Sequence, residues 1–199
     1  MEATMHAEPW SGYLFLDTET GGLDPARHSL LTLGLVVGGP EGVRHSLEIL
    51  LRHETYDVTG GGMAVNRIDL AKHHAAALAP DAALAVLDVF LEQHFPHRCR
   101  PITLVGHNVG FDRDFLKAWL EACGRTFEPR FGHRLVDTHG IAAALRDAGR
   151  LPLEELGSSA LFAHFGIEVP EEQRHTALGD ALATFELYRR LVALAGGAV

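Results

Sequence analysis

The chain has 199 residues, 47% of them hydrophobic, and a formal net charge of −9 at pH 7. This length suffices for one well-buried core and is short for two domains, and no apolar run approaches the roughly 18 residues that span a bilayer. The negative charge excludes a protein that coats nucleic acid non-specifically, because such proteins are usually basic. An acidic chain can still act on a nucleic-acid end if metal ions or a few basic side chains supply positive charge locally.

The N-terminal residues and the cysteines give expectations about domain extent, targeting and disulfides. We expect residues 1–10 to be a flexible N-terminus and residues 11–195 to form a single domain. The first ten residues lack a basic cluster followed by an apolar segment, so we expect no signal peptide and a cytoplasmic location. Cys99 and Cys123 are the only cysteines. Their separation lies outside Cys-x-x-Cys spacing, which argues against a disulfide framework and a cysteine zinc site.

The first half of the chain predicts three strands and a helix. Tyr13–Asp17, Leu30–Val37 and Val43–Leu51 have the composition of strands, and their short connections favour an antiparallel meander. The glycine-rich segment 59–63 is predicted to be a loop. Residues 80–95 begin with Pro-Asp and place apolar residues at helical spacing, so we expect a helix there.

The second half alternates strand and helix patterns. Strands are predicted over 102–106 and 135–137, and helices over 111–123, 139–148, 158–165 and 176–194. A three-stranded meander followed by strand–helix units predicts an α/β fold, in which one mixed five-stranded sheet is covered by helices on both faces.

Carboxylates stand at several points where burial would be costly. In an extended strand, Asp17 and Glu19 project to the same face, and two such charges repel each other unless a cation lies between them. Asp112 begins the helix at 111–123, and Asp180 lies near the start of the last helix. An oxygen-only set favours Mg²⁺ or Mn²⁺ over zinc. A pair of such ions about 3.5–4 Å apart can clamp the attacking and leaving oxygens of a phosphodiester.

His175 is the histidine that the sequence associates with this set. It precedes Asp180 by five residues, and in one continuous helix the two side chains would diverge by about 140°. If Thr176 caps the helix, His175 lies on the preceding loop instead. We expect this loop, which includes Pro170, to be exposed and mobile. A loop histidine beside carboxylates suits a general base that approaches once substrate is bound.

Three ordered motifs carry a family resemblance. D-T-E-T at 17–20, H-N-x-x-F-D at 107–112 and H-x-x-x-x-D at 175–180 resemble the motifs of the DEDDh exonucleases. This DnaQ-like group includes the proofreading subunit of bacterial DNA polymerase III, RNase T and oligoribonuclease. The resemblance covers about 12–182. It implies a ribonuclease H-like fold and hydrolysis from the 3′ end that releases nucleoside 5′-monophosphates.

The resemblance also implies roles for individual residues. Asp17, Glu19, Asp112 and Asp180 match the ligands of two divalent metal ions, Mg²⁺ or Mn²⁺, and His175 matches the base that activates the attacking water. Further matches concern the substrate and its surroundings. Thr20 and Leu23 match positions that touch the terminal nucleotide, Asn108 falls in the second motif and is expected to bind substrate, and Asp137 matches a supporting position.

The expected substrate is a single-stranded 3′ end, with DNA favoured over RNA and a role in proofreading or repair. Trimming of RNA 3′ ends and degradation of short oligoribonucleotides are the alternatives within the same chemistry. A non-catalytic nucleic-acid-binding module is the alternative from another class. A DNA polymerase partner and a homodimer are both compatible with the resemblance, and no membrane association is expected.

Other polar and aromatic residues outside the three motifs are also interpreted. Segment 124–134 interleaves three arginines with Phe127 and Phe131, which fits either a base-stacking platform or a surface loop anchored by its rings. Asp114 is interpreted as a solvated helix charge, and Asp137 as a group that bonds neighbouring backbone. His73 and His74 fit exposed helix ends or loops.

Overall fold

The computed structural model describes residues 10–96, 101–170 and 173–196. The predicted flexible segment 1–10 lies, apart from Trp10, outside these residues, as do Cys99 and part of the loop before His175. Five strands and seven helices are described, in the following order. They are β1 (Tyr13–Thr20), β2 (Leu30–Gly39), β3 (Gly42–Leu50), α1 (Gly60–Asn66), α2 (Leu70–Ala76), α3 (Pro80–His94), β4 (Ile102–Gly106), α4 (Gly110–Ala122), β5 (Phe131–Asp137), α5 (Thr138–Asp147), α6 (Ser158–Phe165) and α7 (Ala177–Leu194).

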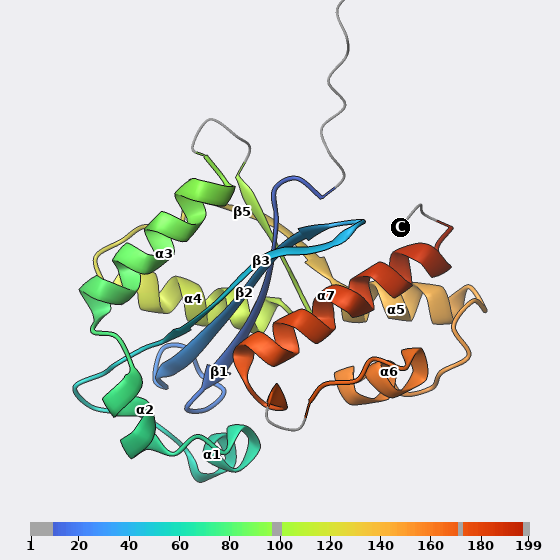
Figure 1. Cartoon of the computed structure of the whole chain (residues 1–199). Coiled ribbons are helices and arrows are strands. Elements are labelled where there is room, and N and C mark those ends of the chain that lie inside the picture. Colours follow the sequence, from blue (N-terminus) through green and yellow to red (C-terminus); the bar gives the residue numbers. More distant parts are fainter. Residues whose placement is uncertain (1–9, 97–100, 171–172, 197–199) are drawn as a thin grey trace, which may run out of the picture.

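The strands form one mixed sheet in the order β3-β2-β1-β4-β5 (Figure 1). The β1–β2 and β2–β3 pairs are antiparallel, whereas β4 runs parallel to both β1 and β5. The predicted meander and the mixed five-stranded sheet are therefore confirmed. β1 is the central strand, so side chains on both of its faces are covered by other elements.

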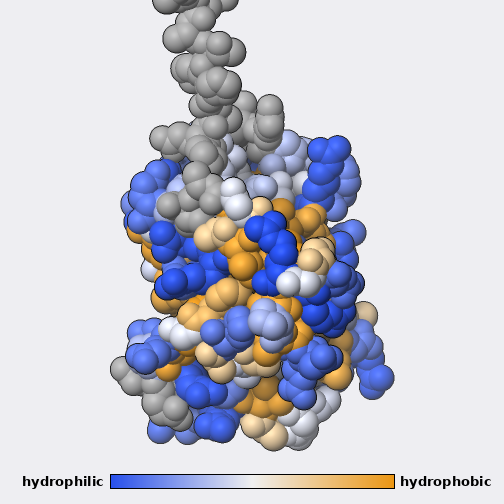
Figure 2. Space-filling model, turned by 90° about the vertical axis from the view of Figure 1, so that its right-hand side faces the viewer, coloured by the Kyte–Doolittle hydropathy of each residue, from blue (hydrophilic) through white to orange (hydrophobic). Residues whose placement is uncertain are grey.

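Helices cover both faces of the sheet. Alternation along β1 places Leu14 and Leu16 in a core shared with α3 and α4, while Phe15 packs against Phe185 of α7 on the other face. Helices α5 and α6 pack beside α7 around a separate apolar cluster that includes Leu161. Figure 2 views the molecule from this side, where hydrophobic residues show between hydrophilic ones. Within the described ranges, no helix has the length and apolar character needed to cross a bilayer.

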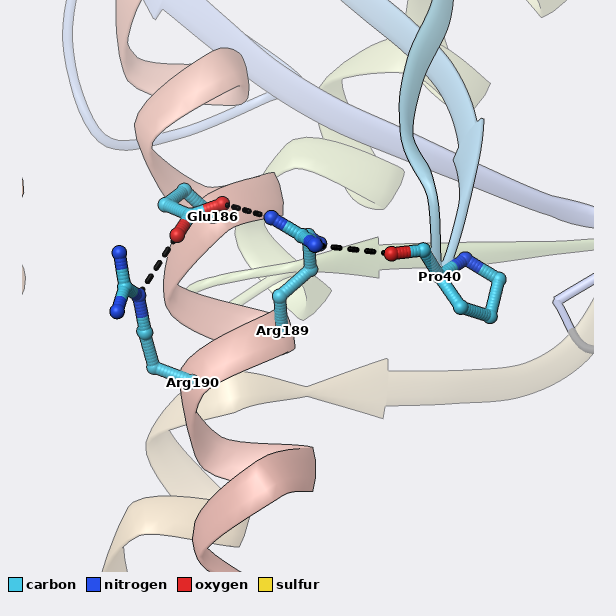
Figure 3. A network of polar contacts seen from close by, with 4 residues as sticks. All are labelled: Pro40, Glu186, Arg189 and Arg190. Carbon is cyan, nitrogen blue, oxygen red and sulfur yellow. Dashed lines mark hydrogen bonds and ion pairs between the residues drawn. The ribbon is translucent and has the colours of Figure 1, made fainter. Parts of the chain in front are cut away.

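The second half of helix α7 is bonded to the turn of the β2–β3 hairpin (Figure 3). The Arg189 guanidinium donates to Pro40 O at 2.8 Å and to Glu186 Oε2 at 2.8 Å, and Arg190 donates to Glu186 Oε1 at 2.7 Å. The partly buried bond to Pro40 connects the helix with the turn of the hairpin. α7 thus packs along β2 with a defined position along its axis.

Two predictions about the segment after β3 were wrong. Segment 59–63 was predicted to be a loop, but its residues 60–63 belong to α1, whose three glycines have poor intrinsic helix propensity. The helix forms because Thr59 caps it by accepting a hydrogen bond from Gly62 N at 3.0 Å, and because Gly62 packs directly against the backbone of Gly21. His73 is buried rather than exposed, and its ring nitrogen lies 3.1 Å from Leu51 O. Helix α2, which carries it, was not predicted.

Three strands are longer than predicted, and one of them, β2, runs on to Gly39. β1 continues to Thr20, because its pairing with β2 extends to Leu30, so Asp17 and Glu19 lie within the strand. β5 begins at Phe131. Phe127 and Phe131 are buried in the core with their rings stacked at a centroid distance of 4.8 Å. Both rings anchor the segment to the core as the loop reading predicted, but residues 131–134 form part of β5 rather than a loop, and the base-stacking platform was wrong.

Candidate active site

Three of the predicted carboxylates converge between β1 and α7. Asp17 and Glu19 are two residues apart in β1 and share the face that packs against α7, and Asp180 lies in the first turn of that helix. Each offers an oxygen that lies within 4.8 Å of the oxygens from the other two. We call Asp17, Glu19 and Asp180 the acidic cluster. Its spacing is small enough for all three side chains to hold one cation.

Asp112 reaches the same region from the opposite face of the sheet. It is buried in the first turn of α4, and its Oδ1 accepts a 2.7 Å hydrogen bond from the Thr18 hydroxyl. Its negative charge raises the pKa of Asp17 more than Asp180 or Glu19 does. Asp112 therefore adjoins the acidic cluster, although it is outside the group whose oxygens meet within 4.8 Å.

His175 lies immediately before α7, as the capping argument predicts. Thr176 has extended backbone and its hydroxyl accepts a hydrogen bond from Gly179 N at 3.1 Å, so the helix begins after His175. His175 itself adopts a left-handed conformation with φ of 59°. Burial raises the pKa of Asp180, and the neighbouring His175 opposes this shift. The imidazole is thus beside the acidic cluster and on a different backbone segment from its carboxylates.

Two cavities adjoin this region. One of about 660 Å³ lies between α6 and the start of α7 and is lined by His175 and Asp180, together with Phe162 and Arg174. The second, of about 360 Å³, lies between α2 and the sheet and is lined by Glu19, His175 and Glu48. His175 contributes to both cavities. The acidic cluster therefore borders both cavities, through Asp180 in the first and Glu19 in the second.

The carboxylates are held in an environment that disfavours their charges. Burial is the largest cause of the raised pKa of each of these carboxyl groups. It raises the pKa of Asp17 well above its ordinary value. Burial, Asp180 and Asp112 raise the pKa of Glu19 to about 8. Burial raises the pKa of Asp112 to about 7, although the hydrogen bond from Thr18 opposes the shift. An oxygen-only donor set that is costly to ionise alone fits hard divalent cations, which stabilise the ionised form.

The predicted substrate-binding residues lie at different depths. Thr20 is buried, and its hydroxyl donates to Gly22 O at 2.7 Å. Leu23 is 83% exposed, the largest exposed fraction among the large hydrophobic residues that the structure describes. Asn108 is exposed, has a φ of 58°, and its backbone N–H donates to Asp137 Oδ1 at 3.0 Å. The side chains of Leu23 and Asn108 are thus exposed to solvent, whereas the Thr20 side chain is bonded within the turn.

Helix α1 supports that turn and was not anticipated from sequence. The Asn66 side chain is buried, donates to Thr20 O at 3.0 Å and accepts from Ile68 N at 3.1 Å. Thr59 N donates to Gly21 O at 2.6 Å. A clue was available in Thr59, because threonine is a preferred helix N-cap. The glycine run concealed the helix.

The remaining acidic candidates are structural or solvated. Asp137 caps α5 by accepting from His139 N at 2.9 Å, in addition to its bond with Asn108, which confirms the backbone-bonding interpretation. Asp114 is exposed and forms an ion pair with Arg113, whose Nη2 lies 2.7 Å from Asp114 Oδ1. Neither side chain belongs to the acidic cluster.

Known proteins resemble the chain in sequence and in fold. The family model RNase_T, described as an exonuclease, matches residues 14–188. A DNA polymerase III subunit epsilon-like protein of Rhodobacter capsulatus is 29% identical over 181 residues, which are 90% of this chain and 23% of that protein. The chain therefore spans about a quarter of the length of this curated relative.

Solved structures give the same fold. E. coli Exonuclease I in complex with a dT13 oligonucleotide superposes with a TM-score of 0.74 at 16% identity, covering 92% of this chain and 41% of that one. Exonuclease X in complex with 5′ overhanging duplex DNA superposes with a TM-score of 0.63 at 21% identity, covering 92% and 93%. The predicted ribonuclease H-like fold is thereby confirmed. With a family model that spans residues 14–188, the chain belongs to the RNase_T exonuclease family and is a DnaQ-like member of the DEDDh type.

Proposed function

We propose that the protein is a metal-dependent 3′–5′ exonuclease that removes nucleoside 5′-monophosphates from single-stranded DNA ends. The observation that carries this proposal is the convergence of Asp17, Glu19 and Asp180 within 4.8 Å, with His175 on the adjoining loop. Membership of an exonuclease family supports the reaction class. The structure of Exonuclease I with a dT13 oligonucleotide supports single-stranded DNA as the substrate class.

The acidic cluster and Asp112 would hold two divalent cations, Mg²⁺ or Mn²⁺. Their oxygen-only donors match the preference of these ions, and the raised pKa values of Glu19 and Asp112 reflect charges that a cation would offset. When bound, such a pair supplies electrostatic stabilisation to the attacking and leaving oxygens of a phosphodiester. The carboxylates would fix the positions of the cations, because β1 and the helices α4 and α7 hold these side chains from both faces of the sheet.

His175 would act as the general base. A neutral imidazole can accept the proton of the attacking water, and Asp180 beside it would stabilise the imidazolium that forms. Because His175 stands outside the helix, its side chain can reorient without disturbing the Asp180 backbone. The two functions, holding charge and moving a proton, are thereby assigned to different segments of the chain.

The turn after β1 would receive the terminal nucleotide. Exposed Leu23 offers an apolar surface for a base, and Asn108 offers an amide at the start of α4. Bonds from Asn66 and Thr59 hold the backbone of Thr20 and Gly21 in place. A DNA polymerase partner is a further part of the proposal, supported by the name of the Rhodobacter relative.

The test is digestion of matched 5′-labelled single-stranded DNA and RNA with Mg²⁺, Mn²⁺ or EDTA. We expect a metal-dependent ladder that shortens from the 3′ end, faster on DNA, and its loss in Asp17→Asn. Asp114→Asn, which neutralises an exposed carboxylate outside the cluster, is the matched control and should retain activity. Faster cleavage of RNA would favour 3′-end trimming or oligoribonuclease activity. Binding without cleavage under every metal would favour a non-catalytic module.

A further inference from the structure

The first turn of α7 rests on β2 with no side chain between them. Gly34 of β2 is paired with Asp17 of β1 on one side and with Glu48 of β3 on the other, so the three residues form one row across the sheet. Residues paired in this way project to the same face. A Cβ at Gly34 would lie 2.1 Å from Ala177 O. The beginning of α7 therefore lies directly over this row, with a carboxylate on each side of it.

These two carboxylates have different relationships to the helix. Asp17 meets Asp180 in the acidic cluster. Glu48 instead accepts a hydrogen bond from the backbone N–H of Leu178 at 3.3 Å, across 130 residues of sequence. The first N–H groups of a helix have no partner within it, and a carboxylate there also interacts favourably with the helix dipole. Thr176 caps one of these groups from within the loop, and Glu48 caps another from the sheet.

We propose that Glu48 is a positioning residue for the active site. Its bond to Leu178 sets the position of the first turn of α7 relative to β1, and that turn carries Asp180 two residues later. His175, which directly precedes the cap, is positioned by the same contact. The effect on catalysis rests on the proposed exonuclease function, whereas the effect on the helix and on cation binding does not.

Arg189 offers a matched control for this proposal. Like Glu48, it joins α7 to the β2–β3 hairpin, through its 2.8 Å bond to Pro40 O (Figure 3). It lies nine residues after Asp180, which corresponds to about 13 Å along the helix axis. Replacing Arg189 therefore removes an anchor of the same helix on the same hairpin, but away from the acidic cluster. A general loss of α7 packing can be separated in this way from a loss of position at its first turn.

The direct test is hydrogen exchange of the Leu178 amide under native conditions. Glu48→Ala should accelerate this exchange about tenfold, because a hydrogen bond to a charged group is lost. Glu48→Gln should retain most of the protection, since its amide oxygen still accepts the bond. Arg189→Ala should leave the Leu178 amide unchanged. Exchange at Leu178 that does not respond to Glu48→Ala would overturn the proposal.

The functional test compares Mn²⁺ titrations and single-strand digestion in the same variants. Glu48→Ala should raise the Mn²⁺ Kd and lower kcat, each about tenfold, with the KM for the oligonucleotide within about twofold of the wild type. Glu48→Gln should restore most of both, and Arg189→Ala should lower Tm without changing either. An equal loss in Glu48→Gln and Glu48→Ala would assign the effect to charge and overturn the positioning role, as would wild-type values in Glu48→Ala. A wild type that cleaves no polymer would refute the proposed function, while Leu178 exchange and Mn²⁺ affinity would still decide the role of Glu48.

Discussion

Thr18 donates a 2.7 Å hydrogen bond to Asp112 from the opposite side of the strand that presents Asp17 and Glu19. The two residues are 94 positions apart and both are buried. Because side chains alternate along β1, the strand faces α7 with its two carboxylates and faces α4 with the Thr18 hydroxyl. One short segment therefore organises carboxylates that come from both sides of the sheet.

The Thr18–Asp112 bond should contribute to both stability and activity. Thr18→Val keeps the shape of the side chain but removes the donor, so we expect the free energy of unfolding to fall by about 1–3 kcal/mol and kcat to decrease. The pKa of Asp112 should rise further. Thr18→Ser preserves the hydroxyl and is the control. Urea unfolding and single-strand digestion measure the two effects, and equal behaviour of the valine and serine variants would contradict the expectation.

The metal-free protein should lose stability as pH rises from about 4 to about 8. Glu19 has a pKa of about 8 in the folded protein and an ordinary value near 4 when unfolded. Between these limits the folded state binds more protons, so its stability is full below the lower value and falls as pH approaches the upper one. We expect Tm in EDTA to fall over this range less steeply in Glu19→Gln, and Mg²⁺ to recover stability in the wild type at pH 8.

The control for this pH dependence is Glu121→Gln, which neutralises an exposed carboxylate on α4. Its Tm should follow the wild-type curve. Identical pH dependence in the Glu19→Gln and wild-type proteins would contradict the assignment of the change to the acidic cluster.

Gly34 should tolerate no side chain. In Gly34→Ala the added methyl group would meet Ala177 O, so α7 must move away from β2. We expect a loss of about 1–3 kcal/mol in the free energy of unfolding and a weaker Mn²⁺ site, because Asp180 moves with the helix. Gly61→Ala is the contrasting control, since nothing would lie within 4 Å of a Cβ added at this position. Alanine at position 61 should stabilise α1 by up to about 1 kcal/mol.

Leu23 should affect substrate binding and leave the fold unchanged. Because it is 83% exposed, Leu23→Ala should keep the wild-type Tm. Loss of the proposed contact with the terminal base should raise the KM for single-stranded DNA about tenfold, equivalent to about 1.4 kcal/mol. Val89→Ala on α3, where the side chain is 56% exposed, should change neither quantity. A wild-type KM in Leu23→Ala would remove this residue from the substrate site.

Local patterns in the sequence predicted much of the fold and singled out the three carboxylates that converge between β1 and α7. Strand alternation placed Asp17 and Glu19 on one face, and the capping preference of Thr176 separated His175 from α7. Both depend on neighbouring residues only, since backbone geometry sets the direction of successive side chains. The order of the three motifs was sufficient to indicate the exonuclease family.

Contacts between distant segments were decided only by the tertiary structure. The glycine run at 60–62 becomes helical because it fits against Gly21, and Phe131 belongs to a strand because it pairs with Ile102 of β4. Likewise, the pairing of Gly34 with Asp17 and Glu48 depends on strand register, which brings α7 onto the sheet. Local sequence determines which side chains share a face, whereas packing against remote residues determines which faces meet and how closely.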